Sequence, residues 1–157
     1  MQGKYFSFGA TSAVITSLAV IVGLSRTANP VIGITTALVV IAIADNISDS
    51  FGIHVHQESQ KESVKEVRKT TFTNFATRVA AVAIFVLLVI LLPVKAAVIL
   101  SIFFGMTVIS IISYFVAKEQ KTKPSKVVFH HLLITALVIT GSYLLREASA
   151  RLIAKFT

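Results

Sequence analysis

Apolar residues fill five long stretches of this chain, separated by shorter polar or turn-forming segments. A helix needs about 20 mostly apolar residues to cross a bilayer. The pattern therefore predicts five membrane-spanning helices, over residues 6–24, 31–53, 74–92, 95–117 and 127–145. Only one connection, residues 57–73, is polar at length, so we expect an all-α integral membrane protein with a single five-helix domain over residues 1–157.

The second stretch runs on past the length that a membrane requires. Between Val31 and Lys69 the chain has no proline, and we expect its helix to leave the membrane and extend into the cytosol. The polar end of this extension carries acidic residues at intervals of four. They and a nearby histidine are candidates for gathering metal ions at the cytoplasmic surface: Glu58, Glu62, Glu66 and His56.

The composition also favours an integral membrane protein. Hydrophobic residues make up 55% and charged residues 14%, whereas about 25% of a soluble domain is charged. The absence of cysteine excludes disulfides and thiolate metal sites. We attribute the net charge of +8 to basic loops at an anionic membrane surface and expect no nucleic-acid partner.

The distribution of lysine and arginine over the loops favours a cytoplasmic N-terminus and an outside C-terminus. Arg78, at the start of the third predicted span, adds to the basic cytoplasmic side. Because the chain is short, we expect a prokaryotic plasma membrane, or a vacuolar-type membrane in a eukaryote.

Two aspartates, Asp45 and Asp49, lie inside the second span. Four residues apart, they share one helix face at about 6 Å along the axis, and each costs on the order of 3 kcal/mol to bury at mid-membrane. Asn46, Ser48 and Ser50 add polarity over the same turns. We interpret this face as part of an ion or proton pathway. The alternative, two solvated aspartates at the membrane interface, stays open.

No motif of an enzyme occurs in the chain, and we expect a protein that is not an enzyme. The first span is instead rich in small residues, which let helices approach closely in lipid. We predict helix packing within or between subunits, and a homodimer, at Gly9, Ala13 and Gly23, together with Gly52 of the second span.

Two segments resemble the vacuolar iron transporter (VIT) family: "GATSAVITSLAVIVG" at 9–23 and "NISDSFGIHVHQESQ" at 46–60. The residues at matching positions of the second are Ile47, Ser48, Gly52, Ser59 and Gln60. The resemblance covers essentially the whole chain. The chain lacks the large metal-binding insert that some members of the family carry. It implies a dimeric exporter of Fe²⁺ or Mn²⁺ from the cytosol, coupled to protons, with a pathway between the first two helices.

The chain departs from the family pattern where that pattern carries metal ligands. The first-helix Asn and Asp of the family fall on Thr11 and Ser12, the second-helix Met on Asp49, and the following Glu on Ile53. We therefore expect Ser12 and Asp49 to face one another, with Asp45 one turn deeper. Such an all-oxygen site suits harder ions such as Mn²⁺.

The pathway residues predicted in this way are Asp45, Asp49, Ser12, Thr11, Asn46 and Ser48. The expected function is transport of divalent metal ions, with the metal as substrate and no permanently bound cofactor. Two alternatives stay open: a transport-inactive structural or regulatory membrane protein of the same fold, and a conductor of protons or monovalent cations.

Overall fold

The computed structural model describes residues 2–155, and the side chains of residues 7–155. The described chain is helical: α1 (Gln2–Leu24), α2 (Pro30–Val40), the π-helical turn η1 (Ile41–Asp45), α3 (Asn46–Ser59), α4 (Val64–Leu91), α5 (Val94–Glu119) and α6 (Pro124–Ile153). Because α2, η1 and α3 form one continuous rod, five long rods result, each long and apolar enough to cross a membrane. The predicted all-helical fold with five long apolar helices is confirmed.

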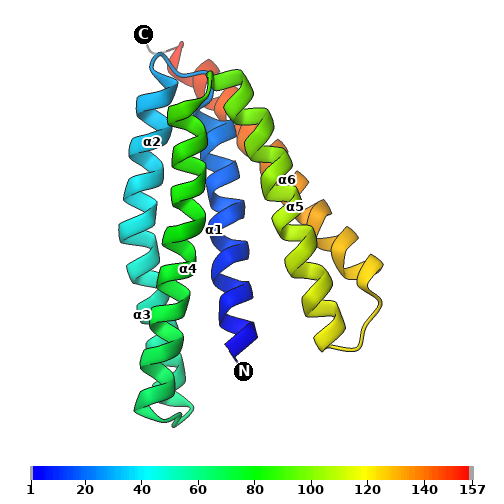
Figure 1. Ribbon diagram of the computed structural model, residues 1–157. Helices are drawn as coiled ribbons and strands as arrows, with labels where there is room; N and C mark the ends of the chain where they lie inside the picture. The colour runs from blue at the N-terminus through cyan, green and yellow to red at the C-terminus, as the bar shows by residue number, and fades with distance from the viewer. Residues whose placement is uncertain (1, 156–157) are drawn as a thin grey trace.

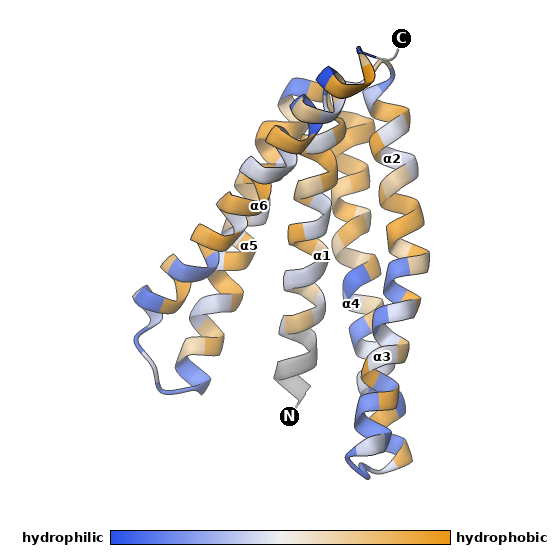
Figure 2. Ribbon diagram, turned by 180° about the vertical axis from the view of Figure 1, so that it is seen from behind, coloured by the Kyte–Doolittle hydropathy of each residue, from blue (hydrophilic) through white to orange (hydrophobic). Residues whose placement is uncertain are grey.

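The central helix of the bundle is α1 (Figure 1). It packs against α4 and α2 on one side and against the α5–α6 pair on the other. The pair diverges from α1 toward the α5–α6 turn, which lies at the same end of the molecule as the α3–α4 turn and the start of α1 (Figures 1 and 2). The hydrophilic residues of α3 and α4 also gather toward this end (Figure 2).

The extension of the second helix is shorter than the sequence predicted. We expected helix as far as Lys69, but α3 ends at Ser59 and the chain reverses, so that residues from Val64 onward belong to α4. Lys61 takes a left-handed conformation with φ of 57°, and the Ser63 hydroxyl accepts a hydrogen bond from the Glu66 backbone N–H. A serine followed three residues later by glutamate is the signature of a helix N-terminus, and it marks this turn.

The π-helical turn keeps one face of the second rod buried along its length. Buried residues lie four apart on either side of this turn: Ile34 and Leu38 before it, and Asn46 and Ser50 after it. Leu38 and Asn46 are eight residues apart. Eight residues of regular α-helix would rotate Asn46 by about 80° away from Leu38. The extra residue accommodated in a π-helical turn removes about that rotation, so Leu38 and Asn46 both lie at 0% exposure.

The buried face of α5 is a stripe of mostly small residues, also at intervals of four: Ala97, Ser101, Gly105, Ile109, Ser113 and Ala117. We call these residues the α5 stripe. At Gly105 the missing side chain makes room for Leu18 of α1, since a Cβ there would lie 2.7 Å from Leu18 Cδ1. The stripe thus lets α1 and α5 approach closely, as small residues do between helices in lipid.

Candidate functional site

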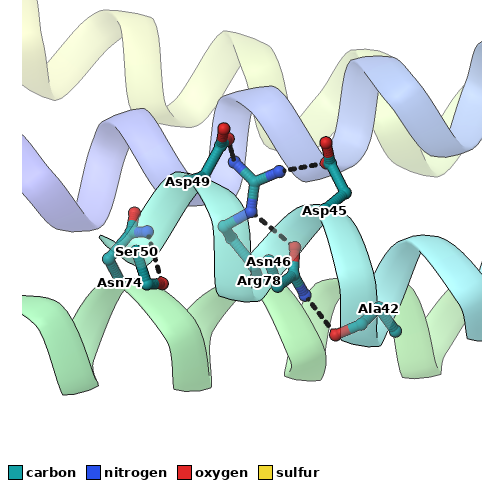
Figure 3. Close-up of polar contacts among 7 residues, drawn as sticks. All are labelled: Ala42, Asp45, Asn46, Asp49, Ser50, Asn74 and Arg78. Carbon is teal, nitrogen blue, oxygen red and sulfur yellow. Dashed lines mark hydrogen bonds and ion pairs between the residues drawn. The ribbon is translucent and has the colours of Figure 1, made fainter. Parts of the chain in front are cut away.

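Arg78 of α4 lies between both aspartates of the second rod (Figure 3). Its side chain is 0% exposed, and each nitrogen of the guanidinium has a partner. Nη2 donates to Asp45 Oδ2 at 2.6 Å, Nη1 pairs with Asp49 Oδ2, and Nε donates to Asn46 Oδ1 at 2.6 Å. Arginine suits this arrangement because its planar fork presents donors in several directions at once.

The π-helical turn orients two of these partners. Asp45 is its last residue and Asn46 is the first residue of α3. Asn46 is fully buried and uses both ends of its amide: Oδ1 accepts from Arg78, and Nδ2 donates to the Ala42 carbonyl oxygen at 2.8 Å. The side chain therefore binds α4 while it also bonds the backbone of the irregular turn, which fixes its orientation.

Further hydrogen bonds join α3 and α4 toward their common turn. Asn74 Nδ2 donates to Ser50 Oγ at 3.2 Å, and Gln57 Nε2 donates to Thr70 Oγ1 at 3.0 Å. Together with the arginine cluster they form what we call the polar seam, which consists of Asp45 of η1, of Asn46, Asp49, Ser50 and Gln57 of α3, and of Thr70, Asn74 and Arg78 of α4. Buried polar groups cost free energy unless they are bonded, so the seam sets the register of these two helices.

Gly9 brings α1 against the same cluster. A Cβ at Gly9 would collide with Asn74 Oδ1 and lie 3.3 Å from Arg78 Cγ. The sequence predicted packing at this glycine, and the structure shows its contact within one chain. Ala13 is also buried, Gly23 lies near the backbone of Ser142, and Gly52 has open space around its Cα.

Thr11 and Ser12 lie elsewhere. They line a hollow of about 340 Å³ between α1 and the α5–α6 pair, together with Val116 and His131. His131 Nδ1 in turn shares a 2.7 Å hydrogen bond with Ser113 Oγ. We expected Ser12 to face Asp49, but the contacts of Asp49 that the structure shows go to α4, and α1 packs on α2 rather than on α3. Ser48 is exposed.

The acidic residues near the α3–α4 turn do not converge. Glu58 lies 3.2 Å from His54, Glu62 accepts from Gln57 at 2.9 Å, and Glu66 belongs to the first turn of α4. His56 is exposed. The spacing of four on one helix, which suggested a shared face, is interrupted by the chain reversal. Among residues 7–155 no three histidine or acidic side chains are placed to hold a metal ion.

Sequence reasoning missed the partner of the aspartates. We counted Arg78 only toward the basic cytoplasmic side, at the start of the third span, whereas its side chain is fully buried and pairs with both aspartates. The buried residues of α4 follow a repeat of three and four residues: Val67, Asn74, Arg78, Val82, Phe85 and Val89. Counting this period back from the apolar residues Val82, Phe85 and Val89 places Asn74 and Arg78 on the same buried face of α4.

The cluster has two negative charges and one positive charge. The Asp45 side chain remains 45% exposed and that of Asp49 35% exposed, while the guanidinium between them is covered. It is therefore a set of oxygen atoms gathered around one cation, open on the carboxylate side. Comparison with known protein families, with curated proteins and with solved structures finds no match for this chain.

Proposed function

We propose that this protein is an integral membrane transporter of cations in which Asp45 and Asp49 form part of the transport site. The observation that carries the proposal is the ionic cluster within long apolar helices, where both carboxylates and the Asn46 amide oxygen meet one cationic group. Ionisable groups inside a membrane are costly, and by default they mark pathways for ions or protons.

The position of the cluster along its helices supports this proposal. Asp45 lies about 22 Å along the second rod from Pro30, and Arg78 lies about 20 Å along α4 from Leu91, at 1.5 Å per residue. Both distances are counted from the same end of the molecule (Figure 1). If that end marks one membrane boundary, the cluster lies within a hydrocarbon layer of about 30 Å.

The substrate class rests on the chemistry of the oxygen atoms and on the resemblance to the VIT family. Carboxylate and amide oxygens suit hard divalent cations such as Mn²⁺ better than they select soft ones. We therefore propose a divalent cation, Mn²⁺ or Fe²⁺, exported from the cytosol and exchanged for protons. A homodimer and a cytoplasmic N-terminus belong to the same proposal.

One observation favours a second candidate, a transport-inactive membrane protein of the same fold. Arg78 neutralises half of the acidic charge: it donates hydrogen bonds from Nε and Nη2 and forms an ion pair through Nη1. A buried ion pair of this kind is sufficient to fix two helices in register, without any role in transport. The two candidates differ in whether removal of a carboxylate abolishes a flux or only lowers stability.

The test is uptake of Mn²⁺ and Fe²⁺ by proteoliposomes, with and without a pH gradient. The variants are Asp49→Asn, which removes one charge of the cluster, and Glu119→Gln as the matched control at an exposed end of α5. The proposal expects flux in the wild type and the control, and flux at the level of empty liposomes in Asp49→Asn. Absence of flux in all three folded proteins would instead favour the transport-inactive candidate.

A further inference from the structure

The guanidinium of Arg78 lies where the oxygen ligands of a cation would converge (Figure 3). We propose that Arg78 is a tethered cation of the transport site: it occupies the position between Asp45, Asn46 and Asp49, and it must leave before a divalent cation binds there. This inference rests on the proposed function and assigns to Arg78 the control of access to the site.

The geometry makes guanidinium and metal mutually exclusive. Each of the three oxygens bonds a different nitrogen, at 2.6 Å for Asp45 and for Asn46. The oxygens are therefore spread around a planar group of several atoms. A divalent ion needs its oxygens at about 2.0–2.6 Å from one centre, so the same oxygens cannot serve the ion until the guanidinium has withdrawn.

The charge count leads to the same conclusion. With Arg78 in place the cluster carries one net negative charge, and without it two, which matches a divalent cation. In a medium of low dielectric constant a positive group a few ångströms away strongly opposes the arrival of another. Arg78 is therefore expected to lower the affinity of the site for divalent ions and to neutralise half of its acidic charge when no ion is bound.

The structure also contains an acceptor that would receive the displaced guanidinium. Asn74 lies one turn before Arg78 on α4, and arginine side chains on helices point back over the preceding turn. Asn74 Oδ1 is buried and has no hydrogen-bond partner. Gly9 of α1 lies next to Asn74 and Arg78, and because it has no side chain, no Cβ of α1 occupies the space beside these two residues.

Calorimetric titration of Mn²⁺ into the purified protein in detergent tests the inference, with circular dichroism as the check of folding. Arg78→Gln should bind Mn²⁺ about tenfold more tightly than the wild type, or better, because the competing charge is gone. The double variant Arg78→Gln/Asp49→Asn restores the wild-type net charge and should lose this gain. If Arg78→Gln binds no more tightly than the wild type, the inference is overturned.

A second substitution covers the case in which Arg78→Gln does not fold. Arg78→Met removes the charge and fills the space with an unbranched, flexible apolar side chain, so it should also bind Mn²⁺ more tightly than the wild type. Equal or weaker binding by a folded Arg78→Met would overturn the inference as well.

The movement of the Arg78 guanidinium away from the aspartates and toward Asn74 has its own test. Asn74→Ala should weaken Mn²⁺ binding about threefold to tenfold in the wild type, where Arg78 needs the acceptor, and leave it unchanged in Arg78→Gln. An equal effect in both backgrounds would exclude this release. These titrations do not depend on flux: tighter binding by Arg78→Gln with no wild-type flux would reject transport alone, and wild-type flux without tighter binding would reject only the role of Arg78.

Discussion

Two contacts of this bundle hold helices together by different means. Between α3 and α4 the polar seam joins side chains by hydrogen bonds and ion pairs, from Arg78 with both aspartates to Gln57 with Thr70. Between α1 and α5 the α5 stripe offers small residues, and Leu18 fills the space over Gly105. In lipid there is no hydrophobic drive between helices, so either bonding or close packing has to supply the attraction. On the α4 side of α1 the helices are joined by the polar seam, and on the α5 side they are joined by close packing.

The difference separates a contact that depends on chemical identity from one that depends on shape. In the polar seam most buried side chains bond one particular partner, so loss of one leaves the other without its bond. In the α5 stripe the main requirement is that most residues be small, although Ser113 also shares a hydrogen bond with His131. The polar seam is therefore where a functional site can be placed, since its charges are already held in fixed positions, whereas the α5 stripe positions α5 and α6.

Among the glycine substitutions the largest effect is expected at Gly9, where a residue of α1 without a side chain packs directly against the polar seam. In Gly9→Ala the new Cβ collides with buried Asn74 Oδ1 and crowds Arg78 Cγ, so α1 must withdraw from α4. Overpacking of this kind costs about 1–3 kcal/mol, and we expect about 2 kcal/mol of lost stability in denaturant titrations followed by circular dichroism.

Gly52→Ala is the matched control for this substitution. Gly52 also lies within a helix but has open space around it, and alanine is the better helix former by about 1 kcal/mol. The control should be neutral or slightly stabilising. Equal losses at Gly9 and Gly52 would show that the close approach of α1 to the polar seam contributes nothing specific.

The sequence predicted the number of rods and their apolar character, because the bilayer requires long apolar runs whatever the packing. It also identified Asp45, Asn46 and Asp49 as the unusual polar residues. What it did not give was their partner, since pairing across 33 residues of chain depends on the α3–α4 reversal. Once Ser63 is recognised as a helix cap, α4 runs antiparallel to α3 and its buried period passes through Arg78.

The expected pairing of Ser12 with Asp49 shows a different limit. It depended on aligning two helices by resemblance, and a helix of small residues presents no single face that the sequence can identify. The structure places Ser12 beside His131 in the hollow next to α5 and α6. Which face of α1 meets which neighbour is decided by packing details, such as Gly9 against Asn74 and Leu18 against Gly105.

A smaller effect is expected at the α5 stripe, because the atoms that a new Cβ meets there belong to the end of a flexible side chain. In Gly105→Ala the Cβ lies 2.7 Å from Leu18 Cδ1, and a rotamer change of Leu18 relieves part of the clash. We expect a loss of about 1 kcal/mol in the same denaturant titrations.

A double-mutant cycle sharpens this prediction. Leu18→Ala alone should cost about 2–5 kcal/mol, but Gly105→Ala added to it should cost nothing more, since the clash has been removed. The coupling free energy should thus be about 1 kcal/mol in favour of the double variant. Strict additivity of the two substitutions would mean that Leu18 and Gly105 do not determine the distance between α1 and α5.

The most local effect is expected at the α3–α4 turn, where Ser63 caps α4 in an exposed position. Ser63→Ala removes the acceptor for the Glu66 backbone N–H, which costs about 1 kcal/mol for a typical cap, while Ser63→Asp retains an acceptor. Hydrogen exchange at the first turns of α4 should therefore speed up about fivefold in Ser63→Ala and stay near the wild-type rate in Ser63→Asp. Exchange in the apolar half of α4, around Val82 and Phe85, should not change, because that half packs without the polar seam. A change that spreads along the whole of α4 would show instead that the turn, and not the arginine cluster, holds α3 and α4 in register.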